Sequence, residues 1–93
     1  MELDLRYTLP SGQTGMGQLL NMSTGGMLFR CDNSLPLGEL IDVALNWPFP
    51  LENGDALELY IHGIILRSTT SGTAISISKH TFRAAAPQES SPL

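Results

Sequence analysis

Three residues in the stretch LLNMSTGGMLF have the types and spacing of a ligand-contacting loop. They are Asn21, Ser23 and Gly26, and they lie between two apolar runs. A carboxamide and a hydroxyl both donate and accept hydrogen bonds, and a glycine lets another group approach the backbone closely. The same residues also suit a plain hairpin turn, in which polar side chains cap backbone N–H groups and Gly25 or Gly26 supplies a positive φ. The stretch alone leaves both interpretations open.

The charge of the chain limits which ligands such a loop could hold. The 93 residues carry a formal net charge of −4, which disfavours a general role in binding nucleic acid or membrane surfaces. No apolar stretch approaches the ~20 residues of a membrane-spanning helix, and the first residues do not resemble a secretory signal, so we expect a cytoplasmic protein without membrane insertion. Any anionic ligand would depend on the few basic side chains, which are Arg6, Arg30, Arg67, Lys79 and Arg83.

The sequence offers little for catalysis or metal binding. Cys31 is the single cysteine, and His62 and His80 have no second ligand at a useful spacing, so neither a metal site nor a cofactor is predicted. Ser23 has no evident histidine and carboxylate partners, and the chain contains neither a P-loop nor a Gly-x-Ser-x-Gly motif. We therefore do not expect an enzyme.

The elements that would position the loop are predicted from the alternation of apolar and polar residues. Residues 2–9 and 40–47 alternate with a period of two, which is typical of strands with one buried face. Six strands separated by turn signals at intervals of roughly ten residues favour a small all-β antiparallel barrel. The expected strands cover residues 2–9, 16–22, 26–31, 40–47, 57–67 and 73–78.

The same pattern predicts the turns, the termini and the core. Gly63 predicts a bulge or bend in the fifth strand, and the Asn53-Gly54 pair predicts a turn before it. Residues 79–86 leave room for a short helical turn. The barrel domain is expected to span residues 1–84 and to be followed by a flexible polar tail, residues 85–93. The side chains expected inside the barrel are Leu5, Leu20, Met22, Val43, Leu45, Leu59 and Ile77.

The order of the segments resembles the PilZ domain family, bacterial receptor modules for cyclic di-GMP. The signature of that family, Asp/Asn-x-Ser-x-x-Gly at the end of the second strand, is matched by Asn21, Ser23 and Gly26. The segments GMLFR, LPLGELIDVAL, GIILR and GTAISI match the later strands of the family in character and order, so that the resemblance covers about residues 3–83. It implies a six-stranded barrel, usually with a C-terminal helix.

The resemblance also implies a binding chemistry for the motif. Asn21 and Ser23 would hydrogen-bond a guanine edge, and Gly26 would let the nucleotide approach the backbone. If both polar residues lie on one strand, they share a face and Met22 points into the barrel. Trp47 is expected to close one end of the barrel.

The chain departs from the family in one respect. The arginine pair Arg-x-x-x-Arg, which the family carries just before the first strand, is not found within these residues, because Arg6 is the one arginine before the motif. Either that segment lies upstream of residue 1 or the domain never had it. Arg67, at the end of the fifth expected strand, is either the candidate replacement that reaches the ligand or a solvated strand end. Two functions follow from the resemblance. One is a cyclic di-GMP receptor with weak or lost affinity that relays the signal to a protein partner or a fused effector domain. The other is a degenerate module that works through protein contacts alone. No DNA or RNA partner is expected.

Overall fold

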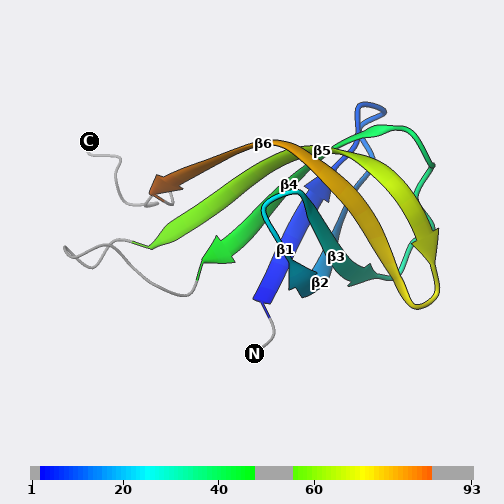
Figure 1. Ribbon diagram of the computed structural model, residues 1–93, viewed down its shortest axis with the longest axis horizontal. Coiled ribbons are helices and arrows are strands. Elements are labelled where there is room, and N and C mark those ends of the chain that lie inside the picture. Colours follow the sequence, from blue (N-terminus) through cyan, green and yellow to red (C-terminus); the bar gives the residue numbers. More distant parts are fainter. Residues whose placement is uncertain (1–2, 48–55, 85–93) are drawn as a thin grey trace.

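Alternation of apolar and polar residues is clearest in the first and fourth strands, Leu3–Thr8 and Leu40–Trp47. The computed structural model describes residues 3–47 and 56–84, and within them all regular structure is β. The strands close into an antiparallel barrel in the order β1-β2-β3-β6-β5-β4 (Figure 1). Their bounds are β1 Leu3–Thr8, β2 Thr14–Met22, β3 Gly26–Cys31, β4 Leu40–Trp47, β5 Leu57–Thr69 and β6 Gly72–Ala84. The predicted six-stranded barrel is confirmed.

The barrel is filled by apolar side chains of its strands together with Leu9 and Leu35 of the connecting loops. Tyr7 and Phe29 are the largest fully buried side chains, and their ring centroids lie 6.1 Å apart. The phenolic oxygen of Tyr7 accepts a hydrogen bond of 2.9 Å from Asn33, so this buried polar atom is satisfied. Expected core residues that are buried are Leu5, Val43, Leu45 and Leu59, while Met22 and Ile77 are partly buried against the core.

One expected core residue, Leu20, is not inside the barrel. It is 37% exposed, because β2 contains a register shift between Leu19 and Asn21 that makes Leu20 an extra residue in the pairing with β3. Leu19 pairs with the buried Phe29 and packs against the core instead. The prediction for Leu20 was wrong because simple alternation does not account for a bulge.

The C-terminal helical turn is also corrected. Residues 79–84 continue β6 as a strand that pairs with β5 as far as Ala84 opposite Leu57. The alternation of His80 and Phe82 with Lys79, Thr81 and Arg83 suits this strand. None of the described residues forms a helix that could cross a membrane. The expected turn at Asn53-Gly54 and the tail 85–93 lie outside the described residues.

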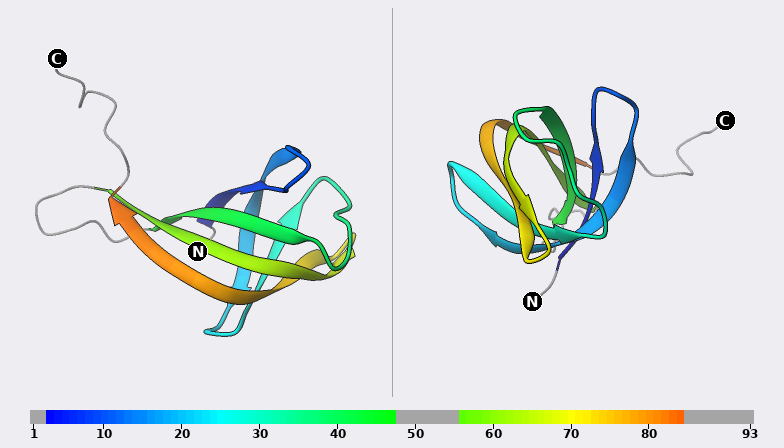
Figure 2. Two further views of the ribbon diagram at one scale, coloured as in Figure 1. Left: turned by 90° about the horizontal axis from the view of Figure 1, so that it is seen from above. Right: turned by 90° about the vertical axis from the view of Figure 1, so that its right-hand side faces the viewer.

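The long hairpin of β5 and β6 carries two irregularities. Between His62 and Gly63 the register shifts, so Ser78 is an extra residue on β6, and the bulge predicted at Gly63 is confirmed. An added Cβ at Gly63 would overlap the carbonyl oxygen of Ser76, which explains the glycine. Leu66 is the second extra residue. Residues 57–62 of β5 and 79–84 of β6 pair with each other and run on past Gly26, where β3 begins (Figures 1 and 2).

Candidate functional site

The bulge at Leu20 determines where the motif points. Without it, strict alternation from the inward Leu19 would direct Asn21 into the barrel. The extra residue resets the alternation, so that Asn21 pairs with Leu28 on the outer face and Met22 pairs with Met27 on the inner face. Asn21 is accordingly exposed, and Met22 is half-buried against the core.

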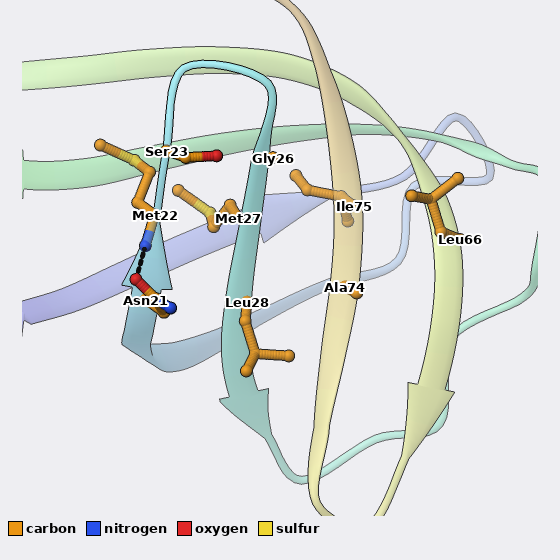
Figure 3. A pocket seen from close by; sticks show the side chains of 9 residues that line it. All are labelled: Asn21, Met22, Ser23, Gly26, Met27, Leu28, Leu66, Ala74 and Ile75. Atoms are coloured by element: carbon orange, nitrogen blue, oxygen red, sulfur yellow. Dashed lines mark hydrogen bonds between the residues drawn. The ribbon is translucent and has the colours of Figure 1, made fainter.

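Asn21 makes one local hydrogen bond and keeps a free donor group. Its Oδ1 accepts a hydrogen bond of 2.8 Å from the backbone N–H of Met22 (Figure 3). Its Nδ2 group donates to no other atom of the described chain, so two N–H donors face outward. A carboxamide in this state is suited to an acceptor such as N7 or O6 of a purine.

Ser23 lies near Asn21, but not because both residues belong to the same strand. It lies beyond the end of β2, in the hairpin turn, so the strand argument that placed it on one face with Asn21 was wrong. The backbone N–H of Ser23 donates to the carbonyl of Gly26 over 2.9 Å, and this bond closes the turn. The turn is held to β6 by a second bond, 3.0 Å, from the N–H of Ile77 to the carbonyl of Gly25.

Gly26 is explained by close packing rather than by an unusual backbone conformation. The motif does form the hairpin between β2 and β3, but neither Gly25 nor Gly26 has the positive φ that the hairpin interpretation expected. A Cβ added to Gly26 would lie 3.2 Å from the carbonyl oxygen of Ile75, which is tight, because β3 and β6 pair at this point. Gly25 has nothing within 4 Å of an added Cβ.

The structure brings the three motif residues together around one depression, which we call the wall hollow (Figure 3). Its volume is about 280 Å³. The apolar part of its lining was not found by sequence reasoning, since only the strand register shows that β5 and β6 reach this place. The lining residues are Asn21, Met22, Ser23, Gly26, Met27, Leu28, Leu66, Ala74 and Ile75.

Size and charge both restrict what the wall hollow can hold. Ligand pockets usually range from about 300 to 1,000 Å³, so this hollow is at the small end and suits one planar base rather than a dinucleotide. No charged side chain lines it. The phosphates of a nucleotide held there would extend over the surrounding surface and would need cations from elsewhere.

Arg67 does not line the wall hollow, but it lies on the same outer face of the barrel as Asn21. Asn21 pairs with Leu28, Leu28 with Ala74, and Ala74 with Arg67, so the four residues form one row across β2, β3, β6 and β5. Adjacent strands are about 4.8 Å apart, which separates the backbones of Asn21 and Arg67 by at most about 14 Å. Arg67 is exposed at the far end of this row.

Three of the other cations lie on a different face, formed by β1, β4, β5 and β6. Arg6 forms an ion pair of 2.9 Å with Glu58, which also accepts a hydrogen bond of 2.8 Å from the hydroxyl of Tyr60. The guanidinium of Arg83 lies 4.6 Å above the centre of the Tyr60 ring. The hydrogen bond to Glu58 is the main cause that raises the pKa of Tyr60 above 10. Lys79 shares this face, because it pairs with the exposed His62 beside Asp42.

A second depression, the mouth groove, opens at the end of the barrel where β5 begins and β6 ends, away from the turn that joins them. Trp47 and Phe82 contact each other there edge to face, with ring centroids 5.2 Å apart. Trp47 thus lies at the barrel end, as expected, but half-buried against the core. The volume is about 300 Å³, and the lining residues are Met22, Ser23, Thr24, Trp47, Leu59, Ile61, Ile77, His80 and Phe82.

Comparison with protein-family models, with curated proteins and with solved structures finds no match to this chain. The assignment of a function therefore depends on the motif and on the geometry described above.

Proposed function

We propose that this chain is a PilZ-like signalling domain of the bacterial cytoplasm that binds cyclic di-GMP through the wall hollow, with low affinity. The observation that carries the proposal is that Asn21, Ser23 and Gly26 line one outward-facing depression. The closed six-stranded barrel, which the resemblance also implied, supports it.

The chemistry of the wall hollow fits one guanine. The Nδ2 donors of Asn21 face outward and can pair with guanine N7 or O6, and the Ser23 hydroxyl can donate or accept beside them. Leu28, Leu66 and Ala74 provide apolar surface for the base. The second guanine and both phosphates would lie outside the hollow, along the row toward Arg67.

We expect low affinity because these residues do not include the Arg-x-x-x-Arg pair of the family. Each bidentate arginine–guanine contact is worth about 1–3 kcal/mol, so a site without two of them binds roughly 30-fold to 10,000-fold more weakly. The net charge of −4 gives no long-range attraction to an anion. Among the described residues, Arg67 is the cation that lies in the same row of paired residues as Asn21.

Calorimetric titration with cyclic di-GMP at low salt tests the proposal. We expect weak binding by the chain itself, stronger binding after an Arg-x-x-x-Arg leader is joined before residue 1, and loss of that gain with Ser23→Ala. Arg67→Gln should weaken binding further, whereas Arg83→Gln, the same change on the face formed by β1, β4, β5 and β6, is the matched control. No binding by the leader form would contradict the proposal.

The second candidate is a module that acts through protein contacts alone. It is favoured by the uncharged lining of the wall hollow and by the apolar mouth groove. Failure of the leader form to bind nucleotide, while the fold is intact, would support this candidate.

A further inference from the structure

The exposed edge of β6 lies beside the mouth groove, so main-chain groups and an apolar depression are accessible at the same place. β6 pairs with β3 from Thr73 to Ser76, and one further backbone bond joins Ile77 to Gly25. From Ser78 to Ala84, the described part of the chain pairs β6 with β5 alone. Alternate N–H and C=O groups on the other edge of this segment are therefore directed away from the sheet. Figure 1 shows this part of β6 running past β3 along the margin of the molecule.

The side chains of this edge alternate between a row that lines the mouth groove and a row on the outer face that carries Lys79 and Arg83. His80 and Phe82 pair with the inward Ile61 and Leu59 and line the mouth groove. Lys79, Thr81 and Arg83 pair with residues on the outer face. Among residues 72–84, three side chains are basic or imidazole and none is acidic, in a chain whose net charge is −4.

We propose that this edge binds an extended segment of a partner protein, which adds to the sheet as a strand beside β6 and whose residues alternate between apolar and acidic. The main-chain groups of the partner would pair with the exposed edge of residues 78–84, as in other recognition by strand addition. Its apolar side chains would enter the mouth groove beside Phe82 and Trp47, and its carboxylates would lie next to Lys79 and Arg83.

The charges select this partner over a second copy of the chain. In an antiparallel pair of two β6 edges centred on Thr81, Lys79 of one copy would lie directly opposite Arg83 of the other. Like charges that face each other across a strand pair are destabilising, whereas opposite charges at the same positions stabilise it. In this register the basic residues oppose self-pairing, whereas they attract an acidic segment.

Trp47 provides the measurement, because it is the single tryptophan and lines the mouth groove. We would titrate the full chain, without nucleotide, with a synthetic capped peptide that alternates valine and glutamate. We expect a saturable change in tryptophan emission. A peptide with lysine in place of glutamate should bind at least about tenfold more weakly, since attraction at two positions becomes repulsion. Two N-methylated peptides are made, each methylated at one of the two alternating sets of residues. The peptide whose methyl groups block the N–H groups that face β6 should not bind, whereas the other should bind.

Charge reversal on the protein completes the experiment. Lys79→Glu should weaken binding of the glutamate peptide and strengthen binding of the lysine peptide, a rescue that damage to the fold would not produce. Arg30→Glu, the same reversal at an exposed position of β3, is the control and should leave both affinities unchanged. Three results would overturn the proposal: no saturable binding of the glutamate peptide, equal binding of both N-methylated peptides, or a concentration-dependent dimer dissociated by Phe82→Ala, which would assign the edge to a second copy.

Discussion

Two adjacent glycines allow a test of whether the last residue of the motif is required by the fold. Both have ordinary backbone angles, so an alanine at either position is free of backbone strain. The difference lies in their surroundings: a Cβ on Gly25 meets nothing within 4 Å, whereas a Cβ on Gly26 lies 3.2 Å from the carbonyl oxygen of Ile75. The pair Gly25→Ala and Gly26→Ala therefore isolates the contact between β3 and β6.

The expected magnitudes can be worked from this contact. Each alanine restricts the unfolded chain and should thereby raise the free energy of unfolding by about 0.4–1 kcal/mol. For Gly26→Ala, β3 must also move a few tenths of an ångström from β6, and overpacking of this kind costs about 1 kcal/mol at the low end of its range. Gly25→Ala should therefore be more stable than Gly26→Ala by about 1 kcal/mol, or about 4–8 °C in melting temperature for a domain of this size.

Thermal unfolding followed by far-ultraviolet circular dichroism measures the difference. Equal melting temperatures, or a higher one for Gly26→Ala, would refute the packing explanation. If Gly26→Ala kept its stability and lost binding of cyclic di-GMP, the glycine would serve the ligand rather than the fold.

Three further predictions concern individual side chains. Met22→Asp should destabilise the protein by about 2–4 kcal/mol, because it places a charge against the core, whereas Asn21→Ala should cost about 1 kcal/mol or less; melts with the reverse ranking would mean that Asn21 faces inward. Tyr7→Phe should lower the free energy of unfolding by about 1 kcal/mol, since it removes the acceptor for Asn33; denaturant unfolding that matches the parent would contradict this. Glu58→Gln should lower the pKa of Tyr60 toward 10, as followed by phenolate absorbance. Because folding raises that pKa, Tyr60 contributes stability that is present below pH 10 and lost as the pH rises through the folded-state value, and this loss should shrink in Glu58→Gln.

The fold was predictable because its information is local and repeated. Leu5, Val43 and Leu45 follow strict alternation, and each is buried where the alternation places it. Gly63 marked its bulge because a glycine within an apolar strand usually signals a bulge, a bend or a close approach of another backbone. The bulge at Leu20 carried no such mark. Leu19 and Leu20 are both leucines, so the sequence does not show which of them faces inward.

The candidate site was predictable only in part, for the same reason. The motif identified Asn21, Ser23 and Gly26, but their arrangement depends on the register of β2 with β3, which the bulge sets. Leu66 and Ala74 reach the wall hollow through the pairing of β3 with β6 and β6 with β5, between residues distant in sequence. The helical turn expected at residues 79–86 is wrong over the described residues 79–84, because their pairing with β5 outweighs the local sequence preference.

The hairpin between β2 and β3 gives the wall hollow and the mouth groove a common boundary. Met22 and Ser23 line both depressions. The backbone bond from Ile77 to Gly25 holds the turn against β6. An occupant of either depression therefore contacts a hairpin that is fixed to β6, which lines the other depression as well.

If cyclic di-GMP and an acidic peptide both bind, each should therefore change the affinity for the other, and linkage requires the two factors to be equal. The check is a closed cycle of four titrations: nucleotide with and without saturating peptide, and peptide with and without saturating nucleotide. A factor of one in both directions would show that the hairpin stays rigid and transmits nothing. A factor that differs from one and is lost in Met22→Ala would assign the coupling to the one apolar side chain that touches both depressions.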